Sequence, residues 1–168
     1  MTRYIHNSIL SLGYSKDTLI AAIVAALAAM LTVTFGVAPW VMFIGWIAFF
    51  TNPSSFSHGL KSALCVSLGV ILGAVAHLCI GPLSSYIGSA SLGLVVFVVA
   101  IIVITLRDVP VINNIVAWFL GLVTFFAIHV EASISVILQL VITVIFGTLA
   151  GFLASLLQQK LLISKENY

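Results

Sequence analysis

The chain has 168 residues, of which 62% are hydrophobic and only 6% are charged, and its formal net charge is +2. Because a soluble domain carries about 25% charged residues, this composition excludes an ordinary soluble enzyme and a nucleic-acid-binding domain. The mean hydropathy of +1.32, with several apolar runs long enough to cross about 30 Å of hydrocarbon, predicts an all-α polytopic membrane protein.

Six transmembrane helices are predicted along the chain. They cover residues 18–35, 37–51, 59–80, 91–106, 111–128 and 133–157. Residues 1–17 are expected to form a cytoplasmic N-terminal segment, and residues 158–168 a cytoplasmic tail. Gly81 and Pro82 open an uncharged stretch that is predicted to be the turn between the third and fourth helices.

The second predicted helix is short. A helix over residues 37–51 reaches only about 22 Å, and Asn52 and Pro53 follow it as a stop signal. It therefore either spans the membrane with compensation or is broken or re-entrant, and the same alternative applies to the fifth helix. Non-helical backbone is tolerated at membrane depth only where it is buried in protein or lines a water-filled cavity.

One motif occurs twice and indicates internal duplication. Phe43–Phe50 reads FIGWIAFF and Phe119–Phe126 reads FLGLVTFF, with the first Phe, the Gly and both closing Phe residues identical. Each copy is followed by a Gly-x-x-x-Gly pair, which lets helices approach closely, either within one chain or between subunits. The two pairs are Gly69/Gly73 and Gly147/Gly151. We therefore predict two three-helix repeats, residues 18–80 and 91–157.

Every basic residue falls on one side of this arrangement. Because six crossings return the chain to its starting side, the two termini and the second and fourth connections lie together. These segments hold all the Lys and Arg residues, namely Arg3, Lys16, Lys61, Arg107, Lys160 and Lys165. The positive-inside rule then places both termini in the cytoplasm. Since a three-helix unit ends opposite its start, the second repeat is predicted to be inverted, as in many transporters.

The sequence carries no recognisable catalytic or metal-binding pattern. It lacks a nucleophile elbow, a zinc-protease helix motif, a phosphate-binding loop and a cysteine pair at metal spacing. No Asp or Glu falls within a predicted span. We therefore expect that the protein is not an enzyme and has neither a metal nor a cofactor.

The repeated aromatic motif is the candidate for a solute pathway between the repeats. The residues assigned to this pathway or constriction are Phe43, Gly45, Trp46, Phe49, Phe50, Asn52, Phe119, Gly121, Phe125 and Phe126. The alternative is that phenyl rings at helical spacing face lipid or pack in the core. The match between the two copies favours a shared role without deciding which.

Five further polar residues are candidates for contact with a solute. They are His77, Asn113, Asn114, His129 and Glu131. His77 either bonds to another helix or faces the solute, and the two asparagines either line an inner vestibule or cap the fifth helix. His77, His129 and Glu131 lie toward the outer face, and they are the groups that an ion- or proton-coupled carrier would use.

Several local patterns stand out in the first half of the chain. They are Pro39-Trp40, Phe43-x-Gly45, Phe49-Phe50-x-Asn52-Pro53, Gly59-Leu60-Lys61 and the Gly69/Gly73 pair. Together they resemble small bacterial inner-membrane proteins grouped as domain of unknown function 1097. The similarity covers residues 20–157 and implies a multi-pass protein of the bacterial inner membrane. The resemblance supplies no activity.

The sequence thus predicts a passive channel or facilitator for a small neutral or weakly polar solute. Its pathway would lie between the inverted repeats, and the protein would be a homo-oligomer in the lipid bilayer. One alternative is a non-transporting scaffold or a subunit of a larger complex. The other is the ion- or proton-coupled carrier, with His77, His129 or Glu131 as the coupling groups.

Overall fold

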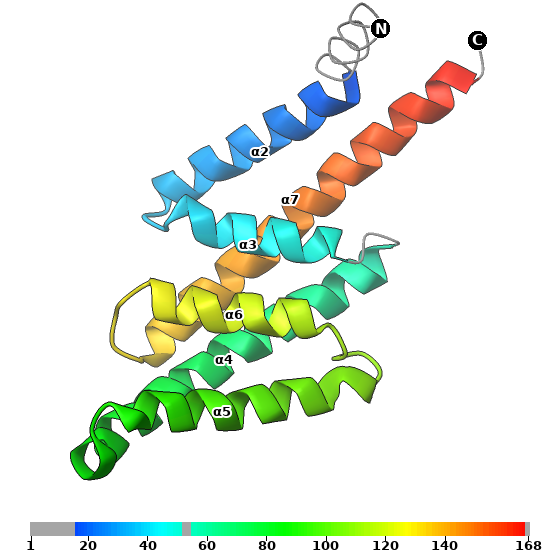
Figure 1. The fold of residues 1–168 in the computed structure, drawn as a ribbon. Coiled ribbons are helices and arrows are strands. Elements are labelled where there is room, and N and C mark those ends of the chain that lie inside the picture. Colours follow the sequence, from blue (N-terminus) through cyan, green and yellow to red (C-terminus); the bar gives the residue numbers. More distant parts are fainter. Residues whose placement is uncertain (1–15, 52–54, 167–168) are drawn as a thin grey trace, which may run out of the picture.

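The computed structural model describes residues 16–51 and 55–166, and it describes side chains for residues 18–51 and 55–160. Within these ranges the chain is helical and contains no strand. The elements, drawn in Figure 1, are α2 (Lys16–Thr34), α3 (Pro39–Phe50), α4 (Phe56–Ile87), α5 (Ala90–Thr105), the 3₁₀ turn η1 (Leu106–Asp108), α6 (Ile115–Ala127) and α7 (Ile134–Glu166). The predicted all-α class is confirmed.

The largest difference from the sequence prediction is the end of α4. The predicted turn at Gly81 and Pro82 is absent, and the helix continues through Pro82 to Ile87. It ends at Gly88, whose φ of 58° is a backbone conformation that glycine adopts without steric penalty. The residue that signals the turn is therefore Gly88 and not Pro82. A proline inside a helix removes one hydrogen bond but does not necessarily end the helix. At the other end of the chain, α7 continues into the predicted tail as far as Glu166.

The connections between helices alternate between two sides. In Figure 1 the start of α2, the end of α3, the start of α4, the connection 106–114 and the end of α7 lie toward the right, and the turns 35–38, 88–89 and 128–133 lie toward the left. We call these the basic side and the turn side. Five of the basic residues lie in elements at the basic side: Lys16 begins α2, Lys61 is near the start of α4, Arg107 lies in η1, and Lys160 and Lys165 are near the end of α7. Arg3 lies outside the described residues.

Three helices in the described part of the chain are long and apolar enough to cross a membrane. They are Phe56–Ile87, Ala90–Asp108 and Ile134–Lys160, whereas Thr18–Thr34, Pro39–Phe50 and Ile115–Ala127 are shorter apolar helices. With a rise of about 1.5 Å per residue, α3 reaches roughly 18 Å and α6 roughly 20 Å, against about 30 Å of hydrocarbon. This apolar helical character indicates a membrane protein.

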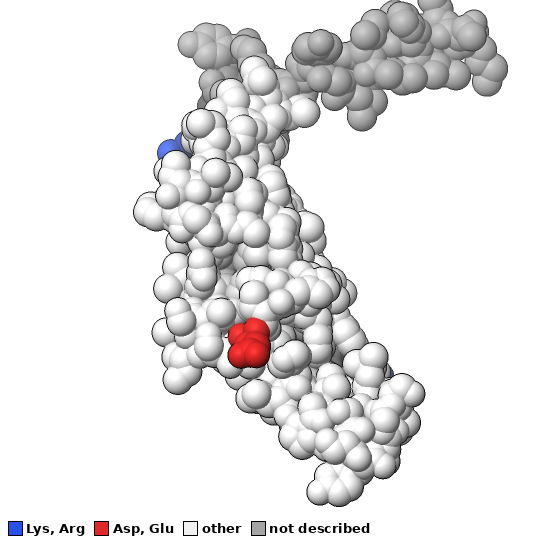
Figure 2. Space-filling model, turned by 90° about the vertical axis from the view of Figure 1, so that its left-hand side faces the viewer, with Lys and Arg blue, Asp and Glu red and all other residues white. Residues whose placement is uncertain are grey.

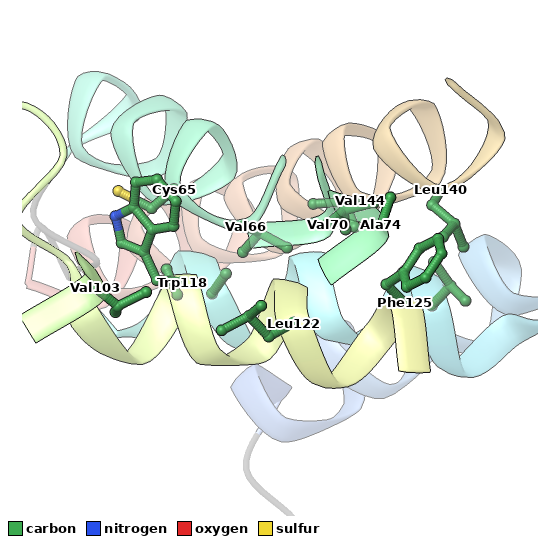
Figure 3. Close-up of a cluster of buried hydrophobic side chains, with 13 residues drawn as sticks. Cys65, Val66, Val70, Ala74, Val103, Trp118, Leu122, Phe125, Leu140 and Val144 are labelled. Carbon is green, nitrogen blue, oxygen red and sulfur yellow. The ribbon is translucent and has the colours of Figure 1, made fainter. Parts of the chain in front are cut away.

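The two long helices α4 and α7 contact each other, and each is covered by helices from the other half of the chain. α5 and α6 pack on α4, while α2 and α3 pack on α7. Figure 3 shows the buried cluster at this junction, where Val66 and Val70 of α4 meet Leu122 of α6 and Val144 of α7. The valines are fully buried and Leu122 is 7% exposed, so the junction is closely packed.

Glycines make the two closest helix crossings possible. At the crossing of α3 and α7, a Cβ on Gly45 would clash with the Val144 carbonyl oxygen, and one on Gly147 with the Met42 carbonyl oxygen. At the crossing of α4 and α6, Gly69 meets the Trp118 carbonyl oxygen in the same way. The absence of a side chain therefore lets backbone lie on backbone, as the glycine pairs predicted.

Candidate functional site

A cavity of about 520 Å³ opens on the turn side, between His77 of α4 and the end of α6. Its lining residues are His77, Phe125, Phe126, His129, Val130 and Glu131. We call it the histidine cavity. Its volume falls within the usual range of ligand sites, about 300 to 1,000 Å³. Three of the five polar candidates from the sequence, His77, His129 and Glu131, thus lie in one place together with two phenyl rings of the repeated motif.

The position of His77 follows from the crossing of α4 and α6. Gly73 lies one helical turn before His77, and a Cβ on Gly73 would come within 3.0 Å of the Cβ of Phe125. Because α6 lies so close, the His77 ring contacts two aromatic neighbours edge-on, with centroid distances of 5.9 Å to Phe125 and 6.4 Å to Phe126. Phe125 is buried and forms the floor of the cavity, while His77 is exposed at its edge.

His129 is held by the end of α6. Its φ of 52° places it in the left-handed region that follows many helix ends, and its backbone N–H donates to the Phe126 carbonyl oxygen at 3.4 Å. The side-chain Nδ1 lies 2.8 Å from the Ala127 carbonyl oxygen. Since a carbonyl oxygen only accepts, Nδ1 is the protonated nitrogen, and Nε2 of the neutral ring remains an acceptor. The imidazole is therefore oriented by its own helix, with one nitrogen available to a solute.

The electrostatic character of the cavity is set by Glu131. In Figure 2, which views the turn side, acidic atoms gather in one central place and basic atoms appear only at the margins. The turns 35–38, 88–89 and 128–133 contain no Lys or Arg. The only ion pair within the described residues, Arg107 Nε to Asp108 Oδ2 at 3.5 Å, lies on the basic side. With neutral imidazoles, the mouth of the cavity is therefore formally negative.

A second, apolar cavity of about 410 Å³ adjoins the first between α4, α5 and α6. Its lining residues are Ala76, Val95, Val96, Val99, Phe119, Leu122, Val123, Phe126, Ala127 and His129. Phe126 and His129 line both cavities. The α5 residues in this lining could not be anticipated from the sequence, because α5 is a nearly uniform aliphatic run in which no residue stands out.

The other aromatic residues of the motif do not lie around one constriction. Phe49 is buried against Gly59 of α4 and Gly151 of α7, whereas Phe125 packs on Gly73 of α4. Since Gly59 and Gly73 are fourteen positions apart on one helix, the two rings are separated by roughly 20 Å along it. The remaining aromatic side chains of the set are exposed or half-buried: Phe43, Trp46, Phe50 and Phe119. Asn52 lies outside the described residues.

Asn114 joins three helices at the basic side. Its Nδ2 donates to Thr51 Oγ1 after α3 at 2.6 Å and to Ser62 Oγ of α4 at 2.9 Å, and its Oδ1 accepts from the Ala117 backbone N–H at 3.1 Å. We call this the Asn114 bridge. Asn114 therefore caps α6, and Asn113 beside it is exposed. Sequence reasoning missed Thr51 and Ser62, because their partner is far away along the chain.

Within the described residues, no three His, Cys, Asp or Glu side chains are placed to hold a metal ion. The lining of the histidine cavity comprises two imidazoles, two phenyl rings, one carboxylate and Val130.

Comparison with known proteins identifies the family. Residues 18–159 match the family model described as Protein of unknown function (DUF1097), and the chain belongs to this family. The resemblance inferred from the motifs is thereby confirmed. No curated protein and no solved structure matches the chain significantly.

Proposed function

We propose that this member of the family is a multi-pass membrane carrier that binds a small solute in the histidine cavity. The observation that carries the proposal is that His77 of α4 lines one cavity with His129, Glu131 and two phenyl rings at the end of α6. An ionisable side chain within a membrane-spanning helix is rare and marks a functional position, and His77 lies on α4, which is long enough to span. The ion- or proton-coupled carrier that these three residues suggested is thus preferred to the passive channel.

The proposal includes six crossings arranged as two inverted repeats. Gly45 lies against Val144, and Gly121 lies against Val66. Gly45 and Gly121 are the glycines of the two motif copies, and Val66 and Val144 occupy the same position before the two Gly-x-x-x-Gly pairs. The two motif helices, α3 and α6, run in opposite directions in Figure 1. Equivalent contacts between oppositely directed helices are what an inverted repeat requires, and transporters of this kind change exposure by moving one repeat against the other.

A carrier suits the packing better than an open pore within one chain. The junction of α4, α6 and α7 is filled by buried valines and Leu122. The cavity opens on the turn side, while the Asn114 bridge ties α3, α4 and α6 together on the basic side. We assign the described conformation to the state that is open on the turn side. In the opposite state the Asn114 bridge would break, because the equivalent opening would form beside the end of α3.

A passive channel between copies of the chain is the second candidate. The observation in its favour is that Phe43 of one motif copy and Phe119 of the other are exposed, at 36% and 39%. In a homo-oligomer these rings would line an interface between subunits. A passage there would not need the histidine cavity, so substitutions in the cavity distinguish the two candidates.

The basic residues also support a location and an orientation. Because they lie with the basic side, the positive-inside rule assigns that side to the cytoplasm of a bacterial inner membrane. The histidine cavity would then face outward.

The test is solute uptake into liposomes that contain the purified full chain. A panel of neutral solutes, weak acids and amines is offered with and without an imposed pH gradient. A carrier gives saturable uptake that falls by about tenfold in His77→Leu and Glu131→Gln. Asp108→Asn is the matched control, since Asp108 is an exposed acid on the opposite side. Non-saturable uptake that these cavity variants leave unchanged would support the channel and overturn the carrier.

A further inference from the structure

We infer that the solute is an organic cation with an apolar portion, such as an alkyl or aryl amine. The inference rests on the proposed function and names the chemical class that the site would take. It is carried by the juxtaposition of two cavities of different character at Phe126 and His129, with one carboxylate at the mouth.

The charge of the solute follows from Glu131. It is exposed in the histidine cavity, and no Lys or Arg occurs in the turns on its side. An anion placed there would face the carboxylate without a compensating cation. An ammonium group would instead pair with the carboxylate. One N–H of the same ammonium group could also donate a hydrogen bond to Nε2 of His129.

The aromatic rings favour the same sign of charge. Phe125 and Phe126 line the histidine cavity, and a cation within about 6 Å of a ring centre is attracted by the negative face of the π system. A neutral or anionic head group gains nothing comparable. Carboxylate, imidazole and phenyl rings together are the groups that recognise amines.

The apolar portion of the solute follows from the adjoining cavity. Its wall between α5 and α6 consists of aliphatic and phenyl side chains, with His129 as the one polar residue. Its volume of about 410 Å³ has room for a short alkyl chain or one aromatic ring. A molecule whose head group lies beside Glu131 would extend past Phe126 into this space, where burial of each methylene group strengthens binding.

The experiment measures binding to the full chain in nanodiscs of neutral lipid by calorimetry, with empty nanodiscs as the baseline for partition into lipid. The probes are n-hexylammonium, 1-hexanol and hexanoate, which share one chain length, and n-propylammonium, which shortens it. We expect hexylammonium to bind about tenfold more tightly than each of the other three probes.

Two pairs of variants assign the preference to the two cavities. Glu131→Gln should remove the preference for the cation over hexanol, and Asp108→Asn should keep it. Val123→Phe narrows the apolar cavity and should remove the preference for hexyl over propyl. Val116→Phe is its control, since Val116 lies two turns earlier on α6, is equally exposed at 57%, and is not part of the cavity lining.

Each outcome bears on one proposal or on both. Equal binding of the three hexyl probes, tighter binding of hexanoate, or no effect of Glu131→Gln overturns the inference. If liposomes show cavity-dependent uptake of another solute while no amine binds, the inference fails and the carrier stands. Absence of both amine binding and cavity-dependent uptake overturns both.

Discussion

Gly69 of α4 and Gly121 of α6 lie face to face. A Cβ on Gly69 would be 3.0 Å from the Cα of Gly121, and one on Gly121 would be 2.8 Å from the Cα of Gly69. The partner atoms are backbone and cannot turn aside. The pair thus sets the distance between the two helices that contribute His77 and the phenyl rings to the histidine cavity.

Replacing Gly121 with Ala is expected to destabilise the protein by about 2 kcal/mol or more, because the added methyl group forces the helices apart. The matched control is Gly93→Ala on α5, where an added Cβ has no neighbour within 4 Å. Since alanine favours a helix, the control should be neutral or stabilising by up to about 1 kcal/mol. Thermal unfolding in detergent measures both. Equal effects of the two variants would show that the crossing is not tight.

Sequence reasoning found the features that depend on one helix or on order along the chain. The repeated motif, the glycine pairs and the location of the basic residues are all visible in the sequence, and the structure gives the glycines their crossings. The sequence-based prediction was wrong where the position of a helix end depended on competing local signals. Pro82 suggested a turn, but the helix ends at Gly88, where a positive φ is needed.

The candidate site was predicted only in part. That His77, His129 and Glu131 lie toward one face follows from counting crossings, but their meeting in one cavity depends on how α6 lies across α4. The apolar cavity could not be anticipated, because Val95, Val96 and Val99 look like any other lipid-facing or core residues. Three-dimensional packing alone distinguishes them.

Two of the three phenylalanines of the first motif copy, Phe49 and Phe43, should respond differently to truncation. Phe49 is 1% exposed and lies against Gly59 and Gly151, so Phe49→Ala leaves a cavity and costs about 3 to 5 kcal/mol. Phe43 on the same helix is 36% exposed, and Phe43→Ala should cost about 1 kcal/mol or less. The unfolding midpoints of the two variants in one detergent check the difference. A larger loss for Phe43→Ala would instead place that ring in an interface between subunits.

Two substitutions of Asn114 should separate the stability that comes from capping α6 from the stability that comes from the hydrogen bonds to Thr51 and Ser62. Asn114→Ala removes both, and we expect a loss of about 2 to 3 kcal/mol from one helix cap and two hydrogen bonds. Asn114→Asp keeps the acceptor for the Ala117 backbone N–H but removes the donor to Thr51 and Ser62. It should therefore retain part of the stability.

Asn114→Asp also tests whether the bridge closes the basic side. If it does, a cysteine-reactive reagent on that side should reach the native Cys65 faster in Asn114→Asp than in the parent, both with Cys79 replaced by Ala, since Cys65 is 0% exposed with the bridge in place. Asn113→Ala, beside it, is the control. An unchanged rate would show that the bridge is not a closure.

His129 combines a strained backbone with a side chain in the cavity, and two substitutions separate these properties. His129→Gly relaxes the positive φ and should stabilise the protein by about 0.5 to 1 kcal/mol. His129→Ala keeps the strain and should not stabilise. Both remove the imidazole, so both should weaken binding of hexylammonium by a similar factor. If His129→Gly binds hexylammonium as well as the parent while His129→Ala binds it more weakly, the role of His129 is structural alone.

The short helices α3 and α6 are the elements whose crossing of the membrane most needs a direct test. Single cysteines at Phe35 and Ser57 bracket α3, and cysteines at Asn113 and Ser133 bracket α6, in a chain with Cys65 and Cys79 replaced by Ala. With six crossings, an impermeant maleimide added outside intact cells should label the Phe35 and Ser133 positions. It should reach the Ser57 and Asn113 positions only after the membrane is opened, because these lie with the basic residues. If both cysteines that bracket one helix react from the same side, that helix is re-entrant, and the inverted six-helix arrangement is wrong.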